Sequence, residues 1–362
     1  MDNAYQLYLN HVQSNIKSDP SSLWSFLHLK NGTSRIPGQL RDNNGNIFSE
    51  PQDIVDAFAT TFANVFTVNN STHIESTSIS SNSFSMSSVS IEDLILIMSN
   101  LSNKQTCGDD LVPSFLIRDC RYALAQPLSI IINKALKTST FPDLWKIARI
   151  SPIFKKGDPS LLANYRPISI LSNFAKVFEQ ALYSCIYNNT RSHISLGQHG
   201  FRTGRSTSTN LAVFVQDLSV ALDKREQIDV IYTDFSRAFD VLPHDILLGK
   251  LNNFGFNYPL LKLMESYLIN RNNYVFYNGF TSFRFLSRSG VPQGSNLGPL
   301  LFSLFINDLL ESLNCSILAY ADDLKIYSKI SSLYDAELLQ RELMKIVEWC
   351  YQNRLIINTS KC

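Results

Sequence analysis

The stretch that most constrains the fold of this chain is SILAYADDLKIYS, residues 316–328, in which two aspartates separate two apolar segments. The alternation around them predicts a β-hairpin with Asp322 and Asp323 at its turn. Adjacent carboxylates repel each other unless a cation lies between them or one of them is protonated. Oxygen ligands of this kind suit Mg²⁺. A simple Asp-Asp turn is the alternative, because Asp is a favourable turn residue.

The composition is that of a globular protein with a basic middle segment. Of the 362 residues, 44% are hydrophobic and 17% are charged, which suits two or three domains. The net charge is +1 overall, but it is −5 over residues 1–133, +8 over 134–205 and −2 over 206–362. A basic segment next to an acidic one favours a cleft that handles polyphosphates, although a solvated basic face gives the same pattern.

Targeting and redox signals are few. No run approaches 18 apolar residues, and the first residues lack the basic and then apolar pattern of a signal peptide. We therefore predict an intracellular protein of the nucleus or cytoplasm that is neither secreted nor bound to a membrane. The six cysteines form no CxxC pair, which argues against a zinc finger or knuckle. No pattern in the sequence indicates an oligomeric state.

The best candidate for a domain boundary is a stretch rich in Ser and Thr, residues 69–90, which predicts a flexible linker. Before it, the apolar spacing from Pro51 to Phe66 predicts an amphipathic helix. After it, Ser90 is the expected cap of another helix. Residues 1–68 are then an N-terminal extension.

Two segments carry basic residues in positions that suit phosphates. Residues 145–170 predict two short strands around a basic loop, with Lys155 and Arg166 towards one side. Arg gives a forked contact and Lys a point charge, so the pair suits a triphosphate, and a solvent-facing hairpin is the alternative. A glycine-containing loop with Arg202 and Arg205 precedes a helix and suits a phosphodiester backbone.

Other polar residues are read from their local setting. Asp234 ends a β-rich run, where a buried charge needs a partner. Turn and cap chemistry explains Asp109-Asp110 more simply than a metal site does. His244 has no matching His or Cys nearby, which favours a hydrogen-bonded structural role. The Gly-, Pro- and Ser-rich loop at 289–299 indicates that another group approaches its backbone closely.

Six segments, in this order, resemble the reverse transcriptase domain of non-LTR (LINE-type, jockey-like) retrotransposons. They cover residues 107–362 and read KIARISPIFKKGD with NYRPISILS, GQHGFRTGRST, YTDFSRAFD with VLPHD, SGVPQGSNLGP, YADD, and NRLIINTSKC. The resemblance implies an α+β fold with the fingers and palm of a right-hand polymerase, in which helices flank an antiparallel palm sheet. It implies a fingers-like region over 91–227 and a palm over 228–362, and we expect the thumb to be absent.

The function that the resemblance implies is that of an RNA-directed DNA polymerase, a nucleotidyltransferase that adds dNTPs to a primer 3′-hydroxyl by a two-metal mechanism. Its partners would be an RNA template, a DNA primer and dNTPs, and its cofactor two Mg²⁺ ions, with Mn²⁺ as a substitute. Without a thumb, the chain by itself is expected to have little activity. Two alternatives stay open: a non-catalytic nucleic-acid-binding fragment, and a reverse transcriptase or maturase of the group II intron type.

The resemblance also assigns roles to single residues. The catalytic aspartates match Asp234, Asp322 and Asp323, and the metal contacts are these three with the backbone carbonyl of Phe235. The expected nucleotide-binding residues are Lys155, Arg166, Ser236, Arg237, Ala238, Phe239 and Gln293. The expected nucleic-acid contacts are Arg202 and Arg205, and the candidate proton donor to pyrophosphate is Lys361.

Within this set, Phe239 matches an aromatic gate that would exclude a ribose 2′-hydroxyl and so select deoxynucleotides. A core aromatic on the helix after Asp234 is the alternative for Phe239. Arg237 stands where a lysine is more usual in the family.

Overall fold

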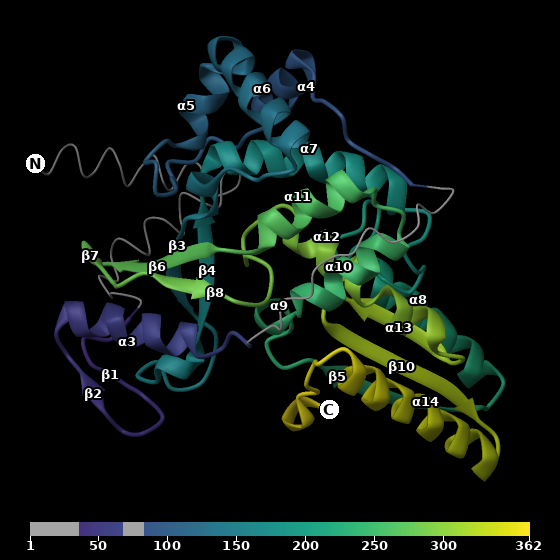
Figure 1. Ribbon diagram of the computed structural model, residues 1–362. Helices are drawn as coiled ribbons and strands as arrows, with labels where there is room; N and C mark the ends of the chain where they lie inside the picture. Colours follow the sequence, from purple (N-terminus) through teal and green to yellow (C-terminus); the bar gives the residue numbers. More distant parts are fainter. Residues whose placement is uncertain (1–35, 68–82) are drawn as a thin grey trace, which may run out of the picture.

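The computed structural model describes residues 36–67 and 83–362 (Figure 1). The first 35 residues of the predicted extension and most of the predicted linker lie outside this range. Within the described residues, no helix has the length and apolar character needed to cross a membrane.

The chain alternates between short strands and helices, which form two sheets, one small hairpin and a large helical layer. In chain order the elements are β1 (Leu40–Arg41), β2 (Ile47–Phe48), α3 (Pro51–Ala63), α4 (Ile91–Ser99), α5 (Ser114–Asp119), α6 (Arg121–Thr138), η1 (Asp143–Lys146), β3 (Ala148–Phe154), η2 (Leu162–Asn164), β4 (Tyr165–Leu171), α7 (Asn173–Thr190), α8 (Thr207–Asp223), β5 (Gln227–Asp234), α9 (Ala238–Val241), α10 (His244–Asn253), α11 (Tyr258–Leu268), β6 (Arg271–Tyr277), β7 (Phe280–Thr281), β8 (Phe285–Ser287), α12 (Gly298–Phe305), α13 (Asn307–Ser312), β9 (Ser316–Tyr320), β10 (Asp323–Ile330), α14 (Leu333–Gln352) and η3 (Thr359–Lys361).

The larger sheet has five strands in the order β4-β3-β6-β7, with β8 also paired to β6. β3 and β4 form the predicted antiparallel ribbon, and β6 and β7 form a hairpin around Asn278-Gly279. Both turn residues of that hairpin have positive φ, which suits an Asn-Gly pair. β3 pairs with β6 in parallel across more than one hundred residues of chain, and this joins the two hairpins into one sheet.

Helix α3 packs against the larger sheet, below it in the view of Figure 1. Its buried face is the one predicted from apolar spacing and includes Val55, Phe58 and Phe62. These side chains share a core with Ile150 of β3 and Val275 of β6. The described part of the N-terminal extension is therefore integral to the same body as the sheet.

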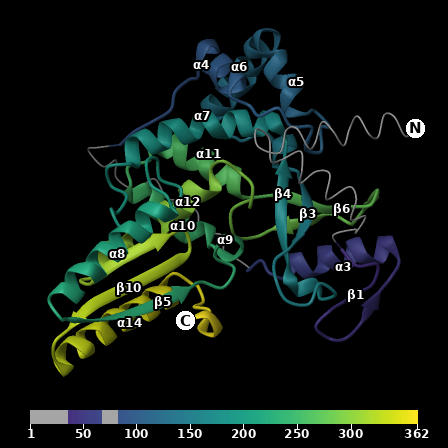
Figure 2. The same ribbon diagram turned by 180° about the vertical axis from the view of Figure 1, so that it is seen from behind.

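The smaller sheet has three antiparallel strands in the order β5-β10-β9. Asp323 lies opposite Tyr320 on one side and opposite Asp234 on the other, so Ala321 and Asp322 form a two-residue turn. The predicted hairpin is confirmed, with Asp322 in its turn and Asp323 one residue later, at the start of β10. Helix α8 covers one face of this sheet and α14 the other, as the two opposite views show (Figures 1 and 2).

The largest core joins the helices α4 to α7 and α10 to α13 to the smaller sheet. The described end of the predicted linker runs along this layer. Phe84 packs edge-on against Phe256, Val89 is buried, and Ser90 caps α4 as predicted. His244 has the predicted structural role, because its Nε2 lies 2.7 Å from the carbonyl oxygen of Gly290.

Candidate active site

A cavity of about 450 Å³ lies where four parts of the chain meet. They are the end of β5, the β9–β10 turn, the β3–β4 ribbon and the C-terminal segment, residues 353–362. Most of the predicted site residues line it. They are Lys155, Arg166, Asp234, Phe235, Ser236, Arg237, Ala238, Phe239, Gln293, Asp322 and Lys361. Asp323, Arg202 and Arg205 do not line it. With Gln293 of the Gly-rich loop, residues from five distant parts of the sequence thus meet at one place.

Two carboxylates enter the cavity from different strands. Asp234, at the end of β5, is buried, and Asp322, in the β9–β10 turn, is half-buried. Burial raises the pKa of Asp322, and the negative charges of Asp323 and Asp234 raise it further. Asp323 begins β10 and is exposed, outside the cavity wall. In the described part of the chain, no three His, Cys, Asp or Glu side chains are arranged as a complete metal site.

The opposite wall of the cavity is basic. Arg166 pairs with Ile153 across the ribbon, and the backbone of Lys155 donates to Asn164, so the alternation of strands puts both cations on one side. Burial lowers the pKa of Lys155, and so do the nearby positive charges of Arg166 and Lys361. Three cations therefore lie close to each other and close to the carboxylates, with an open space between them.

The C-terminal segment closes the cavity beside β5. The backbone N–H of Asn358 donates to the carbonyl oxygen of Asp234 at 2.7 Å, and that of Ser236 donates to Ile356, also at 2.7 Å. The Lys361 ammonium contacts Oδ2 of Asp234, which also accepts from Asn358 Nδ2 at 3.2 Å. Lys361 therefore balances the charge of the buried carboxylate.

The floor of the cavity comes from the segment after β5 and the Gly-rich loop. The ring of Phe239 packs on Phe302, with centroids 4.6 Å apart, and meets Phe201 edge-on. Gln293 Nε2 donates to Oδ1 of the buried Asp240 at 2.7 Å. Burial raises the pKa of Asp240 to about 6. The loop could approach this closely because Gly290, with a φ of +77°, has no Cβ to overlap the backbone of Asp240.

The comparison with known protein families is decisive at this point. Residues 153–362, more than half of the chain, match the family described as reverse transcriptase (RNA-dependent DNA polymerase). The chain belongs to the reverse transcriptase family.

Several relatives come from insect mobile elements, as the jockey-like resemblance predicted. The chain is 30% identical to the probable RNA-directed DNA polymerase from transposon BS of Drosophila melanogaster, over 75% of this chain and 31% of that protein. It is 31% identical to the RNA-directed DNA polymerase from mobile element jockey of Drosophila funebris, over 76% of this chain and 31% of that protein. The chain thus spans about a third of the length of these relatives.

Among solved structures, apo telomerase from Candida tropicalis superimposes with a TM-score of 0.45 at 10% sequence identity, over 75% of this chain and 60% of the other.

The predicted nucleic-acid contacts of this reverse transcriptase family member lie outside the cavity, in the loop between α7 and α8. One nitrogen of Arg202 donates to the carbonyl oxygens of Ile194 and Ser195, at 3.1 and 2.7 Å. These two hydrogen bonds of Arg202 therefore stabilise its own loop. Arg205 is half-buried near the start of α8. Their contact with nucleic acid stays a prediction.

Sequence reasoning missed several residues that line the cavity. Asp240 is the clearest of them, and its signal was a carboxylate set in an apolar run, AFDVL, six residues after Asp234. Asn358 lies in the same C-terminal motif as Lys361, yet no role was predicted for it. Helix α3 adds Thr61 and Phe62 to the cavity wall, and no local sequence pattern predicts this.

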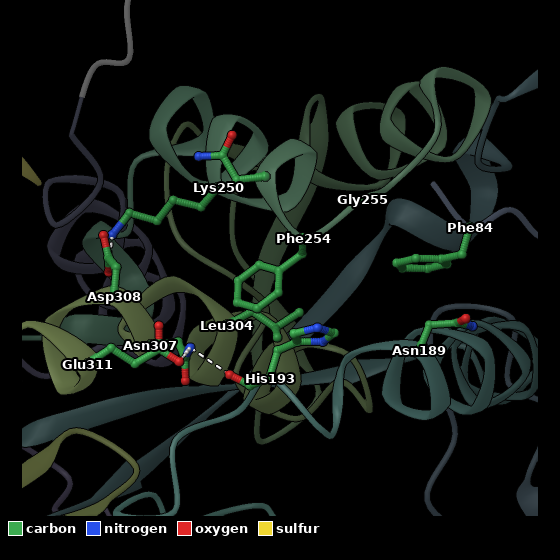
Figure 3. Close-up of a pocket in the computed structure, with 11 residues that line it drawn as sticks. Phe84, Asn189, His193, Lys250, Phe254, Gly255, Leu304, Asn307, Asp308 and Glu311 are labelled. Atoms are coloured by element: carbon green, nitrogen blue, oxygen red, sulfur yellow. Dashed lines mark hydrogen bonds and ion pairs between the residues drawn. The ribbon is translucent and has the colours of Figure 1, made fainter. Parts of the chain in front are cut away.

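A second cavity, of about 560 Å³, lies between the end of α7, α10 and the α12–α13 region (Figure 3). Its polar residues already have partners. Asn307 donates to the carbonyl of His193 at 2.8 Å and to Glu311 at 3.0 Å. Lys250 donates to Asp308 and to the carbonyl of Phe305, both at 2.8 Å. Its one lysine is therefore paired with an aspartate, and this cavity has no group of cations facing carboxylates as the first one does.

Proposed function

We propose that this chain is the polymerase part of a non-LTR retrotransposon protein and extends a DNA primer along an RNA template. In this proposal the smaller sheet with α8 and α14 is the palm, and the larger sheet with the α4–α7 layer is the fingers. Residues 91–227 would then supply most of the fingers-like region and residues 228–362 most of the palm. The exceptions are α8, which lies on the palm sheet, and β6 to β8, which belong to the larger sheet. Helix α3 would be a brace from the N-terminal extension. The partners would be template, primer and dNTPs inside the cell.

The observation that carries the proposal is the meeting of Asp234 and Asp322 with Lys155 and Arg166 in one cavity. Carboxylates on one wall and fixed cations on the other are what a metal–triphosphate complex requires, and Mg²⁺ is commonly held by one or two carboxylates with substrate phosphates and water in the other positions. Burial is the main cause of the raised pKa of Asp322, and the negative charges of Asp323 and Asp234 add to it, so a cation beside Asp322 would be favoured.

In the proposed site, Asp234 and Asp322 would hold the metals, with the carbonyl of Phe235 as a further ligand and Asp323 as a weaker one. When bound, two Mg²⁺ ions lower the pKa of the primer 3′-hydroxyl and offset charge on the leaving pyrophosphate. The donor set fits this role, because it consists of oxygen atoms only. Lys361, which contacts Asp234, would move to the pyrophosphate and supply a proton.

The nucleotide would lie between the ribbon and the segment after β5. Lys155 and Arg166 would hold its phosphates, with backbone groups of Ser236, Arg237 and Ala238 beside them. Phe239 would lie under the sugar and exclude a 2′-hydroxyl, and Gln293, fixed by Asp240, would border the base.

Primer extension tests the proposal. The chain is mixed with a DNA primer on an RNA template, dNTPs and Mg²⁺, and incorporation is followed base by base. We expect slow incorporation that follows the template, since the chain by itself is expected to have little activity. Asp234→Asn should reduce it further, at least ~10³-fold, or about 4 kcal/mol in barrier. The exposed Asp223→Asn should extend like the wild type.

Two results would argue against the proposal. If Asp234→Asn kept more than about a tenth of the wild-type rate, a loss of only ~1.4 kcal/mol, Asp234 would not belong to the reacting centre. Binding of the primer–template duplex without templated incorporation, with Mg²⁺ or Mn²⁺, would favour the alternative of a non-catalytic nucleic-acid-binding fragment.

A further inference from the structure

Gln198 lies in the loop between α7 and α8, outside the cavity, yet it touches the turn that carries Asp322. Its side chain is fully buried. Its Oε1 accepts from the backbone N–H of Gly200 at 2.8 Å and from that of Ala321 at 3.2 Å. Its Nε2 donates to the carbonyl oxygen of Ala321 at 3.4 Å, a long bond. A single side-chain amide therefore engages both polar groups of the residue before Asp322.

The backbone of this loop adds a short parallel pairing to the free edge of β9. Gln198 lies opposite Ala319, the N–H of His199 donates to Ala319 at 2.8 Å, and the N–H of Ala319 donates to Gly197 at 2.9 Å. A Cβ at Gly200 would overlap the backbone nitrogen of Ala321. The backbones of the loop and the turn are therefore so close that only glycine fits at position 200.

The turn itself has a conformation that needs support. Ala321 has a φ of +60°, in the left-handed region that favours glycine. Such a residue persists where the surrounding structure fixes it. The carbonyl that Gln198 holds belongs to the peptide bond between Ala321 and Asp322, so the amide limits rotation just before the carboxylate.

The loop is in turn fixed to α8 and α13. His199 Nδ1 lies 2.8 Å from the hydroxyl of Thr209, which forms the capping box of α8 with Ser206. Asn307 of α13 accepts from the N–H of Ser195 at 2.7 Å. Gln198 therefore acts from a rigid base, as a residue that orients another must.

We propose that Gln198 is a positioning residue whose buried amide holds the Ala321–Asp322 turn so that the Asp322 carboxylate faces the cavity. It would set the affinity of Asp322 for a divalent cation without touching the cation. The inference rests on the proposed function, in which Asp322 is a metal ligand. Partners that orient a ligand commonly change metal affinity 10- to 100-fold when they are removed.

Mn²⁺ binding to the chain tests this directly, without any turnover. Mn²⁺ alone is titrated, and the loss of the EPR signal of the aqueous ion gives the bound fraction. The test variant is Gln198→Met, which keeps the side-chain length and removes the amide. We expect its affinity at the Asp322-dependent site to fall about 10-fold or more. Ala321→Gly, added to Gln198→Met, should recover part of that loss, because glycine adopts a positive φ freely.

The matched control is Asn133→Leu. The Asn133 amide also engages both polar groups of one residue, since it accepts from the N–H of Val89 at 2.7 Å and donates to its carbonyl at 3.1 Å. It lies in the α4–α6 layer, away from the cavity. The control should lower the melting temperature and leave Mn²⁺ affinity unchanged.

The outcomes separate this inference from the function on which it rests. If Asp322→Asn binds Mn²⁺ as the wild type does, the proposed metal site fails and the inference fails with it. If Asp322→Asn weakens binding but Gln198→Met does not, the positioning role alone is overturned. Should Gln198→Met not fold, Gln198→Asn carries the same comparison, because its amide falls one methylene short of the turn.

Discussion

Two Lys–Asp ion pairs in this molecule join similar groups but differ in what surrounds them. Lys250 and Asp308 join α10 to α13, and Lys361 and Asp234 join the C-terminal segment to β5. In the first pair the lysine is the buried partner, 13% exposed against 54% for the aspartate. In the second the aspartate is buried, 8% exposed against 32% for the lysine.

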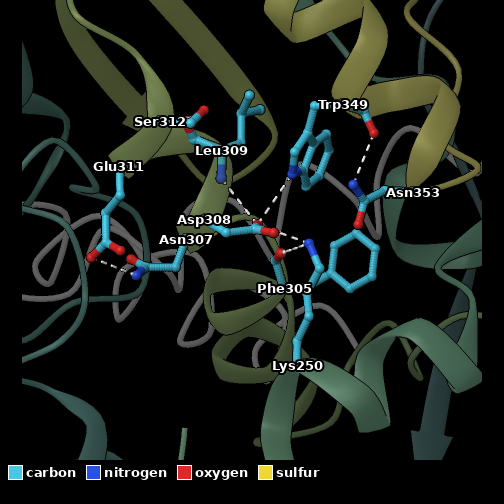
Figure 4. Close-up of polar contacts among 9 residues, drawn as sticks. All are labelled: Lys250, Phe305, Asn307, Asp308, Leu309, Glu311, Ser312, Trp349 and Asn353. Atoms are coloured by element: carbon cyan, nitrogen blue, oxygen red, sulfur yellow. Dashed lines mark hydrogen bonds and ion pairs between the residues drawn. The ribbon is translucent and has the colours of Figure 1, made fainter. Parts of the chain in front are cut away.

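Lys250 has both a carboxylate and a carbonyl as partners, and the carboxylate opposes the lowering of its pKa by burial (Figure 4). Besides Asp308 and the carbonyl of Phe305, it faces the rings of Phe305 and Trp349 at 4.3 and 4.5 Å. Trp349 Nε1 also donates to Asp308 at 3.2 Å. Because Trp349 belongs to α14, this cluster anchors the helix that leads to the C-terminal segment.

Around Asp234, groups of like charge lie near one another. Asp322 enters the same cavity with a raised pKa, and Lys155 stands opposite with a lowered one. Groups of like sign are kept near each other on each wall, which costs stability unless a ligand relieves it. From this comparison we infer that the paired cluster around Lys250 maintains the fold, and we propose that the cluster around Asp234 is prepared for a ligand. The four predictions below test this distinction.

The largest effect is expected for aspartates of the two regions changed in parallel. Asp322→Asn should lower primer extension at least ~10³-fold, about 4 kcal/mol in barrier, with little change in melting temperature. Asp308→Asn should leave extension within about twofold and lower the melting temperature. Extension rates and thermal melts on both variants check this. Equal losses of extension in the two variants would remove the distinction between the regions.

The next effect is the pH dependence of stability due to Asp240. Burial raises its pKa from 3.8 to about 6. Between these values the native chain keeps a proton that the unfolded chain has lost, so the free energy of unfolding falls as the pH rises through this range and is level above it. About two pKa units correspond to about 3 kcal/mol.

Asp240→Asn can still accept the hydrogen bond of Gln293 and does not ionise. We therefore expect its free energy of unfolding, relative to wild type, to rise by about 3 kcal/mol between about pH 4 and about pH 7, as measured by urea denaturation. Asp223→Asn is the exposed control and should show no such rise. A difference that stays level with pH would mean that Asp240 ionises in the folded chain as it does in the unfolded one.

Sugar selectivity at Phe239 is the third prediction. If its ring lies under the ribose, Phe239→Val should raise the incorporation of rATP relative to dATP by roughly 10- to 100-fold, the range expected for relief of a steric clash. Its packing on Phe302 allows the other role, a core aromatic. That role would lower thermal stability and reduce the use of both sugars equally. The ratio of the two incorporation rates, measured with the melting temperature, separates these outcomes.

The sequence was sufficient for those parts of the site that depend on local pattern. Alternation predicted the β9–β10 hairpin, and the same rule put Lys155 and Arg166 on one side of their ribbon. The parallel pairing of β3 with β6 could not be predicted from the sequence, because no turn joins these strands and their pairing depends on the packing of the whole sheet.

Residues that act through another group were missed for a related reason. Gln198 stands in a motif that was interpreted through its arginines, and only the folded chain brings its amide to Ala321. Asp240 follows Phe239 on the short helix α9. The spacing of apolar residues does not show which side chain donates a hydrogen bond to the Asp240 carboxylate. Side-chain partners more than 50 residues apart need the tertiary structure.

The smallest effect separates the two lysines by stability alone. Lys250→Met keeps the apolar stem against Phe305 and Trp349 but removes two donated hydrogen bonds, and it leaves Asp308 without its cation. Since Asp308 is more than half exposed, water takes over part of that role, and we expect a loss of about 1–2 kcal/mol in the free energy of unfolding. Lys361→Met should change it by less than about 1 kcal/mol, because the buried Asp234 keeps the nearby positive charge of Lys155 and the hydrogen bond from Asn358, so its carboxylate is not left unpaired. Urea denaturation of both variants gives the two values. A larger loss for Lys361→Met than for Lys250→Met would mean that the cavity pair also maintains the fold, and that nearby groups of like charge do not by themselves mark a site prepared for a ligand.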